Sequence, residues 1–312
     1  SVVRPDRQPD RSPRRPFVNL TLLHPPPRSW SVDEAYAWCL RLASSHYENF
    51  PVASRLLPRN VRPHIAAVYA FARIADDIAD EPGMENEERL RLLDLWQRRL
   101  DAAYAGTADH PAFIALGQTV RQFELPQQLF ADLLSAFRQD VVTHRYEMFD
   151  DVLDYCRRSA NPVGRLVLLL FGYHDHALAA RSDAICTALQ LTNFWQDLGV
   201  DVGRDRLYVP REDLRRFGCS EEQLMTGKSS EQFRSLMAFE VDRTKDLFRQ
   251  GSTLPGVVRQ PLRLELRLTW LGGMRVLDKI ERSGYTILQN RPRLRWTDVS
   301  AMLIRALRPL TN

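Results

Sequence analysis

The stretch Y-A-F-A-R-I-A-D-D-I-A-D, residues 69–80, indicates a helix whose acidic residues stand where a buried face is expected. Its apolar residues recur at helical spacing, and this register continues past the aspartates. Asp76 and Asp80 are four residues apart and therefore share one helix face, with Tyr69 and Arg73 on about the same stripe. Taken alone, such a cluster is more typical of a solvated helix end whose acids face water.

A second acidic stripe changes that interpretation. In Q-L-T-N-F-W-Q-D-L-G-V-D, residues 190–201, Asn193, Asp197 and Asp201 follow one another at i+4 spacing among apolar side chains. Three oxygen-bearing side chains in line, with no His or Cys nearby, match a hard cation such as Mg²⁺ rather than zinc. Mg²⁺ binds through a few carboxylates plus substrate phosphate oxygens, so two such helices facing each other across a cavity would form a diphosphate site.

Arginines accompany both stripes. Arg73, Arg204 and Arg206 could pair with phosphate oxygens as a leaving group gains charge, although each of them singly also fits a surface ion pair. An arginine-rich segment, residues 285–295, could cap the mouth of a pocket or form a basic surface turn. The tripeptide His-Asp-His at residues 174–176 lacks a third metal ligand at sensible spacing, and we interpret it as an exposed turn.

Apolar residues recur at helical spacing along most of the chain, and strand-like alternation is scarce. Helices are expected at about residues 32–40, 65–80, 85–104, 111–123, 126–141, 163–171, 183–200, 229–250, 259–284 and 297–307. Proline and glycine punctuate them. The pattern predicts an all-α helical bundle whose interior could hold a ligand.

The N-terminal segment differs in composition from the rest of the chain. Residues 1–28 are crowded with proline and arginine, which predicts a flexible arm, whereas no linker interrupts residues 29–312, which we interpret as a single catalytic domain. The arm lacks the apolar core of a signal peptide, and no apolar run reaches the roughly 18 residues that span a bilayer. We therefore expect a cytoplasmic protein, with peripheral contact at the inner face of the membrane as an option.

The charge balance and the cysteines argue against nucleic-acid-binding, zinc-binding and dithiol redox proteins. The 43 Lys and Arg residues are intermixed with 39 Asp and Glu residues, so nucleic-acid binding is a weak alternative and no nucleic-acid partner is expected. The four cysteines stand far apart with no C-x-x-C pair, which argues against a zinc ribbon or a dithiol redox motif.

These motifs resemble those of the squalene and phytoene synthase family, whose members join isoprenoid diphosphates head to head or process the resulting cyclopropyl intermediate. The resemblance covers about residues 31–295. It is carried by residues 69–80, by Tyr155-Cys156 followed by Val163-Gly164, and by residues 190–210, which end in R-D-R-L-Y-V-P. It implies an all-α isoprenoid synthase fold with a central apolar cavity.

The resemblance also implies a set of site residues. Mg²⁺ would be held by Asp76, Asp80, Asn193, Asp197 and Asp201. Matching positions at the diphosphate end or along the path of the carbocation are Tyr69, Arg73, Gln190, Arg206 and Tyr208. Asp77 lies inside the first motif, but its two neighbours match the ligand positions better.

Two segments depart from the commonest family pattern. H-Y-E-N-F-P-V-A-S at residues 46–54 and S-A-N-P-V-G at residues 159–164 look like the bacterial hydroxysqualene synthase branch. That likeness implies conversion of presqualene diphosphate and water to hydroxysqualene, with His46, Tyr47 and Asn49 as substrate-binding candidates. No reductant is needed, and the lack of G-x-G-x-x-G after a strand agrees with the expectation that NADPH is not used.

Further candidate residues would hold the attacking water or stabilise the carbocation. Asn161, with Glu48 or Tyr47 nearby, is our candidate for holding the attacking water, although an Asn-Pro pair also simply begins a helix. The aromatic rings that could steady a cation are equally suited to core packing. They are Phe50, Phe71, Tyr155, Phe194 and Trp195.

Two other functions stay open. The first is a sibling activity that condenses two prenyl diphosphates into presqualene diphosphate or phytoene. The second is a non-catalytic relative that works in assembly, which would have no need to retain both complete acidic motifs.

Overall fold

In the computed structural model, residues 20–25, 28–45 and 58–307 are described, and their regular structure is helical apart from one isolated bridge between Arg145 and Leu207. The predicted all-α fold is confirmed. The helices are α1 (Leu20–Leu23), α2 (Val32–Ser45), α4 (Arg62–Ala79), α5 (Asn86–Ala105), α6 (Pro111–Phe123), α7 (Gln127–Val142), α8 (Phe149–Ser159), α9 (Asn161–Leu170), α10 (His176–Val202), α11 (Arg211–Phe217), α12 (Glu221–Met225), α13 (Glu231–Gly251), α14 (Leu254–Val257), α15 (Leu262–Arg282) and α16 (Trp296–Leu307).

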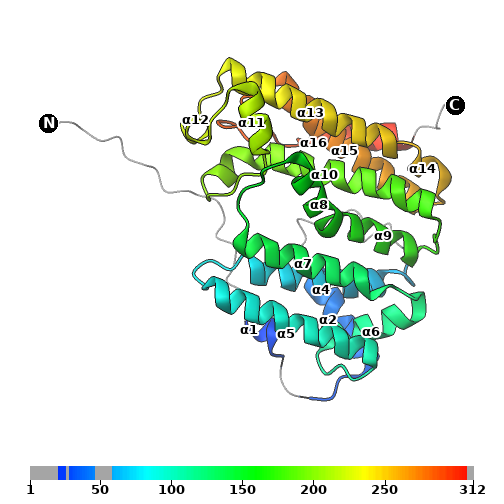
Figure 1. The fold of residues 1–312 in the computed structure, drawn as a ribbon. Helices are drawn as coiled ribbons and strands as arrows, with labels where there is room; N and C mark the ends of the chain where they lie inside the picture. Colours follow the sequence, from blue (N-terminus) through cyan, green and yellow to red (C-terminus); the bar gives the residue numbers. More distant parts are fainter. Residues whose placement is uncertain (1–19, 26–27, 46–57, 308–312) are drawn as a thin grey trace.

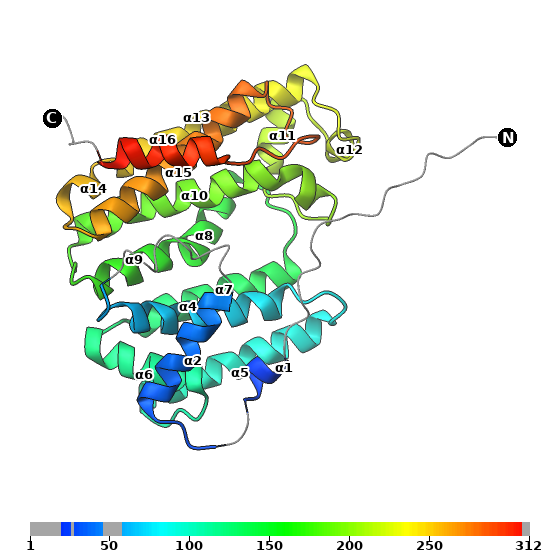
Figure 2. The same cartoon turned by 180° about the vertical axis from the view of Figure 1, so that it is seen from behind.

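The helices form two groups, each around its own hydrophobic core. Helices α1, α2 and α4–α7 make one group, and α10–α16 make the other, with α8 and α9 between them (Figures 1 and 2). Phe71 of α4, packed edge-on against Phe113 and Phe130, lies in the first core. Trp195 of α10 lies in the second. Helix α9 contributes residues to both cores, so the two groups meet along α4, α9 and α10.

The long helices agree with the sequence pattern, and the differences lie at caps and short elements. Residues 111–123 form α6 as predicted. Helix α10 begins earlier than expected because the carboxylate of Asp175 caps it, accepting a hydrogen bond from the backbone N–H of Ala177 (2.6 Å). The tripeptide at residues 174–176 is exposed as predicted, and it leads into this helix, with Asp175 as the N-cap and His176 as the first helical residue. Helix α8 was not expected, because it buries only Val152, Tyr155 and Cys156 and its pattern is short.

Part of the predicted N-terminal arm belongs to the fold. Leu23 of α1 is buried, and its carbonyl accepts a hydrogen bond from Arg99 (2.7 Å). The buried ring of His110 joins α1 to α6, because Nδ1 accepts from the N–H of Ala112 (3.1 Å) while Nε2 donates to the carbonyl of Leu22 (2.8 Å). The Nδ1 contact needs the neutral imidazole, because a protonated Nδ1 cannot accept, and burial lowers the pKa of His110 to about 4.

Within the described ranges, no helix is both long and apolar enough to cross a lipid bilayer.

Candidate active site

The acidic end of α4 is organised by Arg73. Its guanidinium contacts Asp77 through both Nε (3.2 Å) and Nη2 (2.6 Å), whereas Asp76 stands at 3.8 Å from Nη1. The side chain of Asp76 is 41% exposed and that of Asp77 only 20%. Asp77 is therefore the main partner of Arg73, and Asp76 is the better placed of the two to meet a ligand from solvent. The assignment of Asp76 as a metal ligand stays a prediction.

The second stripe lies on the C-terminal half of α10. Asn193 is exposed, and Asp197 forms a bidentate ion pair with Arg291, with Nη2 at 2.9 Å from Oδ2 and Nε against Oδ1. Burial, followed by repulsion from Asp197 and Asp80, raises the pKa of Asp201 to about 6. Since Asp80 belongs to the first motif, this repulsion indicates that the two acidic stripes lie near each other.

Arg206 joins the two stripes directly. It lies just beyond α10, and its Nη2 donates to Oδ1 of Asp80 at the C-terminal end of α4 (2.8 Å). The two motifs, separated by more than a hundred residues of chain, therefore meet where the two helical groups join. The two acidic motifs therefore lie close together in the described part of the chain, with Arg206 between them.

The oxygen-bearing side chains of the two stripes suit magnesium as ligands, although their carboxylates do not converge on one point. Among the described residues, no three His, Cys, Asp or Glu side chains lie close enough together to hold a metal ion. Magnesium, however, takes most of its ligands from water and substrate phosphates and needs only one or two protein carboxylates per ion. An all-oxygen set of Asp76, Asp80, Asn193, Asp197 and Asp201 suits that chemistry.

An aromatic cluster lies beside the stripes. Tyr208 stacks on Phe194 with ring centroids 3.7 Å apart and an interplanar angle of 4°, and Tyr155 and Tyr146 pack around this pair. Phe194, Tyr155 and Tyr208 are therefore grouped together, as candidates for the cation path should be. In contrast, Phe71 and Trp195 are fully buried in the two cores, so plain packing accounts for them.

Asp140 on α7 is a site residue that the sequence analysis missed. Its Oδ2 accepts a hydrogen bond from the hydroxyl of Tyr155 (2.9 Å), while its Oδ1 is buried and has no hydrogen-bond partner in the part of the chain that the structure describes. Burial raises the pKa of this carboxyl to about 7. Helical spacing in the sequence could have indicated that Asp140 faces the interior, because position 140 continues the stripe of buried Leu133 and Ala136.

Asn161 is built into the contact between α9 and α10. It is the first residue of α9, only 8% exposed, and its Oδ1 accepts a hydrogen bond from the hydroxyl of Thr187 (2.9 Å). The helix-start interpretation of the Asn-Pro pair is confirmed, and the amide Nδ2 is left as the group that could face a ligand. Tyr69 and Gln190 are half-buried on α4 and α10. The candidates His46, Tyr47 and Asn49, with Glu48 and Phe50, lie outside the described residues.

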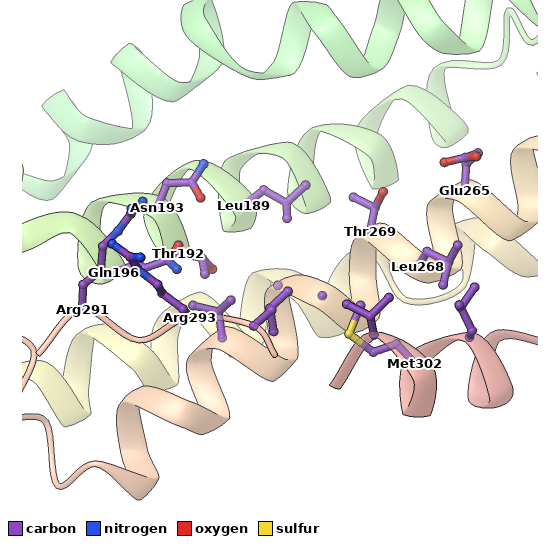
Figure 3. Close-up of a pocket in the computed structure, with 16 residues that line it drawn as sticks. Leu189, Thr192, Asn193, Gln196, Glu265, Leu268, Thr269, Arg291, Arg293 and Met302 are labelled. Atoms are coloured by element: carbon purple, nitrogen blue, oxygen red, sulfur yellow. The ribbon is translucent and has the colours of Figure 1, made fainter. Parts of the chain in front are cut away.

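A cavity of about 630 Å³ opens next to the second stripe (Figure 3). It lies between α10, α15 and α16 and the segment 291–294. Asn193, Gln196 and Arg291 gather at one end of it, and Leu189, Leu268 and Met302 line its course. An apolar cavity therefore lies inside the second helical group, and its polar end shares Asn193 with the second acidic stripe. None of the lining residues that the structure describes belongs to α4, so the predicted central cavity between the two acidic stripes stays a prediction.

The all-α bundle resembles solved structures of isoprenoid synthase-type helical folds. The family model for squalene/phytoene synthase matches residues 43–299. The chain belongs to the squalene/phytoene synthase family, which is a family of enzymes.

Individual relatives fall into more than one activity. The chain is 32% identical to a 15-cis-phytoene synthase of Synechocystis sp. over 89% of this chain and 86% of that protein. It is 39% identical to a hydroxysqualene synthase of Sinorhizobium fredii over 68% of this chain and 72% of that protein. The crystal structure of squalene synthase HpnC from Alicyclobacillus acidocaldarius matches with a TM-score of 0.78 and 43% identity, covering 81% of this chain and 95% of that one.

Proposed function

We propose that this protein converts presqualene diphosphate and water to hydroxysqualene and diphosphate in a Mg²⁺-dependent reaction without NADPH. The observation that carries diphosphate chemistry is the ion pair of Arg206 with Asp80, which joins the two acidic stripes. The choice of product is supported by the segments at residues 46–54 and 159–164. It is also supported by 39% identity to a hydroxysqualene synthase over 68% of this chain, against 32% identity to a phytoene synthase over 89%.

Departure of the diphosphate is assigned to the charged end of the site. When bound, Mg²⁺ neutralises charge that develops on the leaving group, and its proposed ligands are Asp76, Asp80, Asn193, Asp197 and Asp201. Arg73, Arg206 and Arg291 would donate hydrogen bonds to the phosphate oxygens. Each of these arginines is held by a carboxylate before substrate arrives, so the guanidinium groups are positioned in advance.

The organic cation is assigned to the aromatic cluster. Breaking the carbon–oxygen bond leaves a cyclopropylcarbinyl cation, which rearranges to an allylic cation. The faces of Tyr208 and Phe194 carry negative quadrupole charge that attracts such a cation. The carboxylate of Asp140, hydrogen-bonded to Tyr155, adds negative charge behind the rings and fixes the orientation of that phenol.

Water ends the reaction by forming a carbon–oxygen bond with the cation and losing one proton, so that hydroxysqualene, diphosphate and a proton balance the substrate and water consumed. We assign Asn161 as a positioning residue for this water, through its Nδ2, with Tyr47 or Glu48 as partners. Holding the water by one hydrogen bond leaves a lone pair available for attack. Tyr69 and Gln190 are proposed to contact the substrate between the two ends of the site.

The second candidate function is head-to-head condensation of two prenyl diphosphates. It is favoured by the phytoene synthase relative, whose match spans 89% of this chain. A non-catalytic role in assembly is disfavoured because both acidic motifs are retained and their arginine partners are in place.

A substrate comparison tests the proposal. The protein is incubated with Mg²⁺, without NADPH, and with either presqualene diphosphate or farnesyl diphosphate. We expect hydroxysqualene from the first substrate and no product from the second, and loss of activity in Asp76→Ala and Asp197→Ala. Asp246→Ala, which removes an exposed carboxylate on α13, serves as the control and should retain full activity. Formation of presqualene diphosphate from farnesyl diphosphate would establish the condensation instead.

A further inference from the structure

Helix α16 presents an apolar face to solvent. Trp296 is 87% exposed, Leu307 71%, Ile304 60% and Leu303 38%. Their spacing of seven, eight and eleven residues from Trp296 places all four side chains on one side of the helix. Single exposed apolar residues are ordinary, but an exposed tryptophan aligned with three aliphatic residues forms a patch that indicates a binding surface.

The opposite side of α16 is fixed to α15. Asp298, the single acidic residue of α16 and only 4% exposed, pairs with Arg275 (2.8 Å) and Lys279 (2.7 Å). At the other end of the helix, Arg267 donates to the carbonyl of Arg305 (3.0 Å). The apolar face is therefore held outward by contacts at both ends of the helix, and it has no acidic side chain of its own.

The charge around this face is positive. Between residues 293 and 307 the sequence contains three arginines and one acid, and the acid is the inward-facing Asp298. Arg293 and Arg295 are exposed just before α16, and Arg305 is exposed in its last turn. Arg305 also lines, with Arg267, a small hollow of about 230 Å³ at that end. Apolar side chains with Trp at the edge and arginines around them are what anionic lipid surfaces bind.

We propose that α16 and the preceding segment 293–295, together called the α16 face, dock the protein on an anionic lipid surface. The apolar side chains would enter the boundary between headgroups and acyl chains, and the arginines would contact lipid phosphates. The same helix contributes Val299, Met302 and Leu303 to the wall of the cavity. The α16 face thus sets the mouth of that cavity beside lipid. If the proposed function holds, a water-insoluble product could leave by this route.

Vesicle binding by the full chain tests the proposal without any substrate, so its outcome does not depend on the proposed reaction. Co-sedimentation is measured with vesicles of equal parts phosphatidylglycerol and phosphatidylcholine, and with vesicles of phosphatidylcholine alone. We expect binding to the first and roughly a hundredfold weaker binding to the second, since each of the three exposed arginines near an anionic surface contributes about fivefold. Ile304→Glu should weaken binding by about tenfold or more. Met225→Glu, at a position 58% exposed on α12, is the matched control and should bind like the parent.

Two further measurements distinguish lipid binding by the α16 face from dimerisation through it. In the presence of anionic vesicles, tryptophan emission should shift to shorter wavelength, and Trp296→Phe should abolish most of that shift. Light scattering during gel filtration, without vesicles, should give the same mass for the parent and Ile304→Glu. A parent dimer that Ile304→Glu dissociates, equal binding of the parent and Ile304→Glu to anionic vesicles, or no binding at all would each overturn the proposal.

Discussion

Replacing Gly199 by alanine would push the arginine-bearing segment away from the aspartate stripe of α10. A Cβ at position 199 would lie 2.8 Å from the carbonyl oxygen of Leu288, which is backbone and cannot rotate aside. The contact belongs to a junction in which Gln196 also donates to the carbonyl of Pro292 (2.6 Å) and Asp197 holds Arg291. Displacing this segment therefore moves Arg291 relative to the proposed diphosphate site.

The expected effect on stability is small, and the expected effect on anion binding is large. Alanine in a helix interior is favoured over glycine by about 1 kcal/mol, which offsets much of the roughly 1–3 kcal/mol cost of overpacking. Loss of one charge-assisted hydrogen bond costs about 1.5–3 kcal/mol, so the Kd for inorganic pyrophosphate in the presence of Mg²⁺ should rise about tenfold to a hundredfold.

Calorimetric titration with pyrophosphate and Mg²⁺ measures this effect directly. Gly203→Ala is the matched control, because it lies one turn further along the same chain and its Cβ would meet nothing closer than 3.4 Å. The control should bind pyrophosphate like the parent. Equal affinities for Gly199→Ala and Gly203→Ala, in proteins that melt within a few degrees of each other, would refute the role given to Arg291.

Four other outcomes are expected. Asp140→Asn and Tyr155→Phe should each lower kcat by about tenfold or more. In a double-mutant cycle, the kcat of the double variant should be no lower than that of the slower single variant. Burial raises the pKa of Asp140 to about 7, so its ionisation costs stability progressively between about pH 4 and 7, and the whole cost is present above pH 7. Asp140→Asn should therefore melt above the parent at pH 8 but not at pH 4. His110 has a folded pKa of about 4, below its unfolded value, so the free energy of unfolding of the parent should fall by about 3 kcal/mol as pH falls from about 6.5 to 4. Denaturant titrations should show that the free energy of unfolding of His110→Asn depends less on pH in this range. Phe194→Leu should lower kcat with little change in KM, because its stack with Tyr208 is assigned to the cation and not to substrate binding; a change confined to KM would remove it from that role.

Helical spacing predicted the fold and both acidic stripes because those features are local. Residues at i+4 share a helix face whatever the rest of the chain does, so Asp76 with Asp80 and Asp197 with Asp201 could be assigned from sequence. The Asn-Pro start of α9 was also readable from the local sequence.

The ion-pair partners of these aspartates could not be predicted from helical spacing. Asp80 meets Arg206 across 126 positions and Asp197 meets Arg291 across 94, and no periodic signal connects residues so far apart. Asp140 was missed because an aspartate near the end of an amphipathic helix resembles a solvated residue until Tyr155 is seen to cover it. The cavity had the same dependence on tertiary structure, since helices distant in sequence form its walls.

The central claim is that water captures the cation formed from presqualene diphosphate, and isotope labelling tests it most directly. The protein is incubated with presqualene diphosphate and Mg²⁺ in water enriched in oxygen-18, without NADPH, and the product is examined by mass spectrometry. We predict hydroxysqualene that carries one labelled oxygen, in an amount equal to the diphosphate released. An unlabelled hydrocarbon product, or turnover only when two prenyl diphosphates are supplied in place of presqualene diphosphate, would contradict the account.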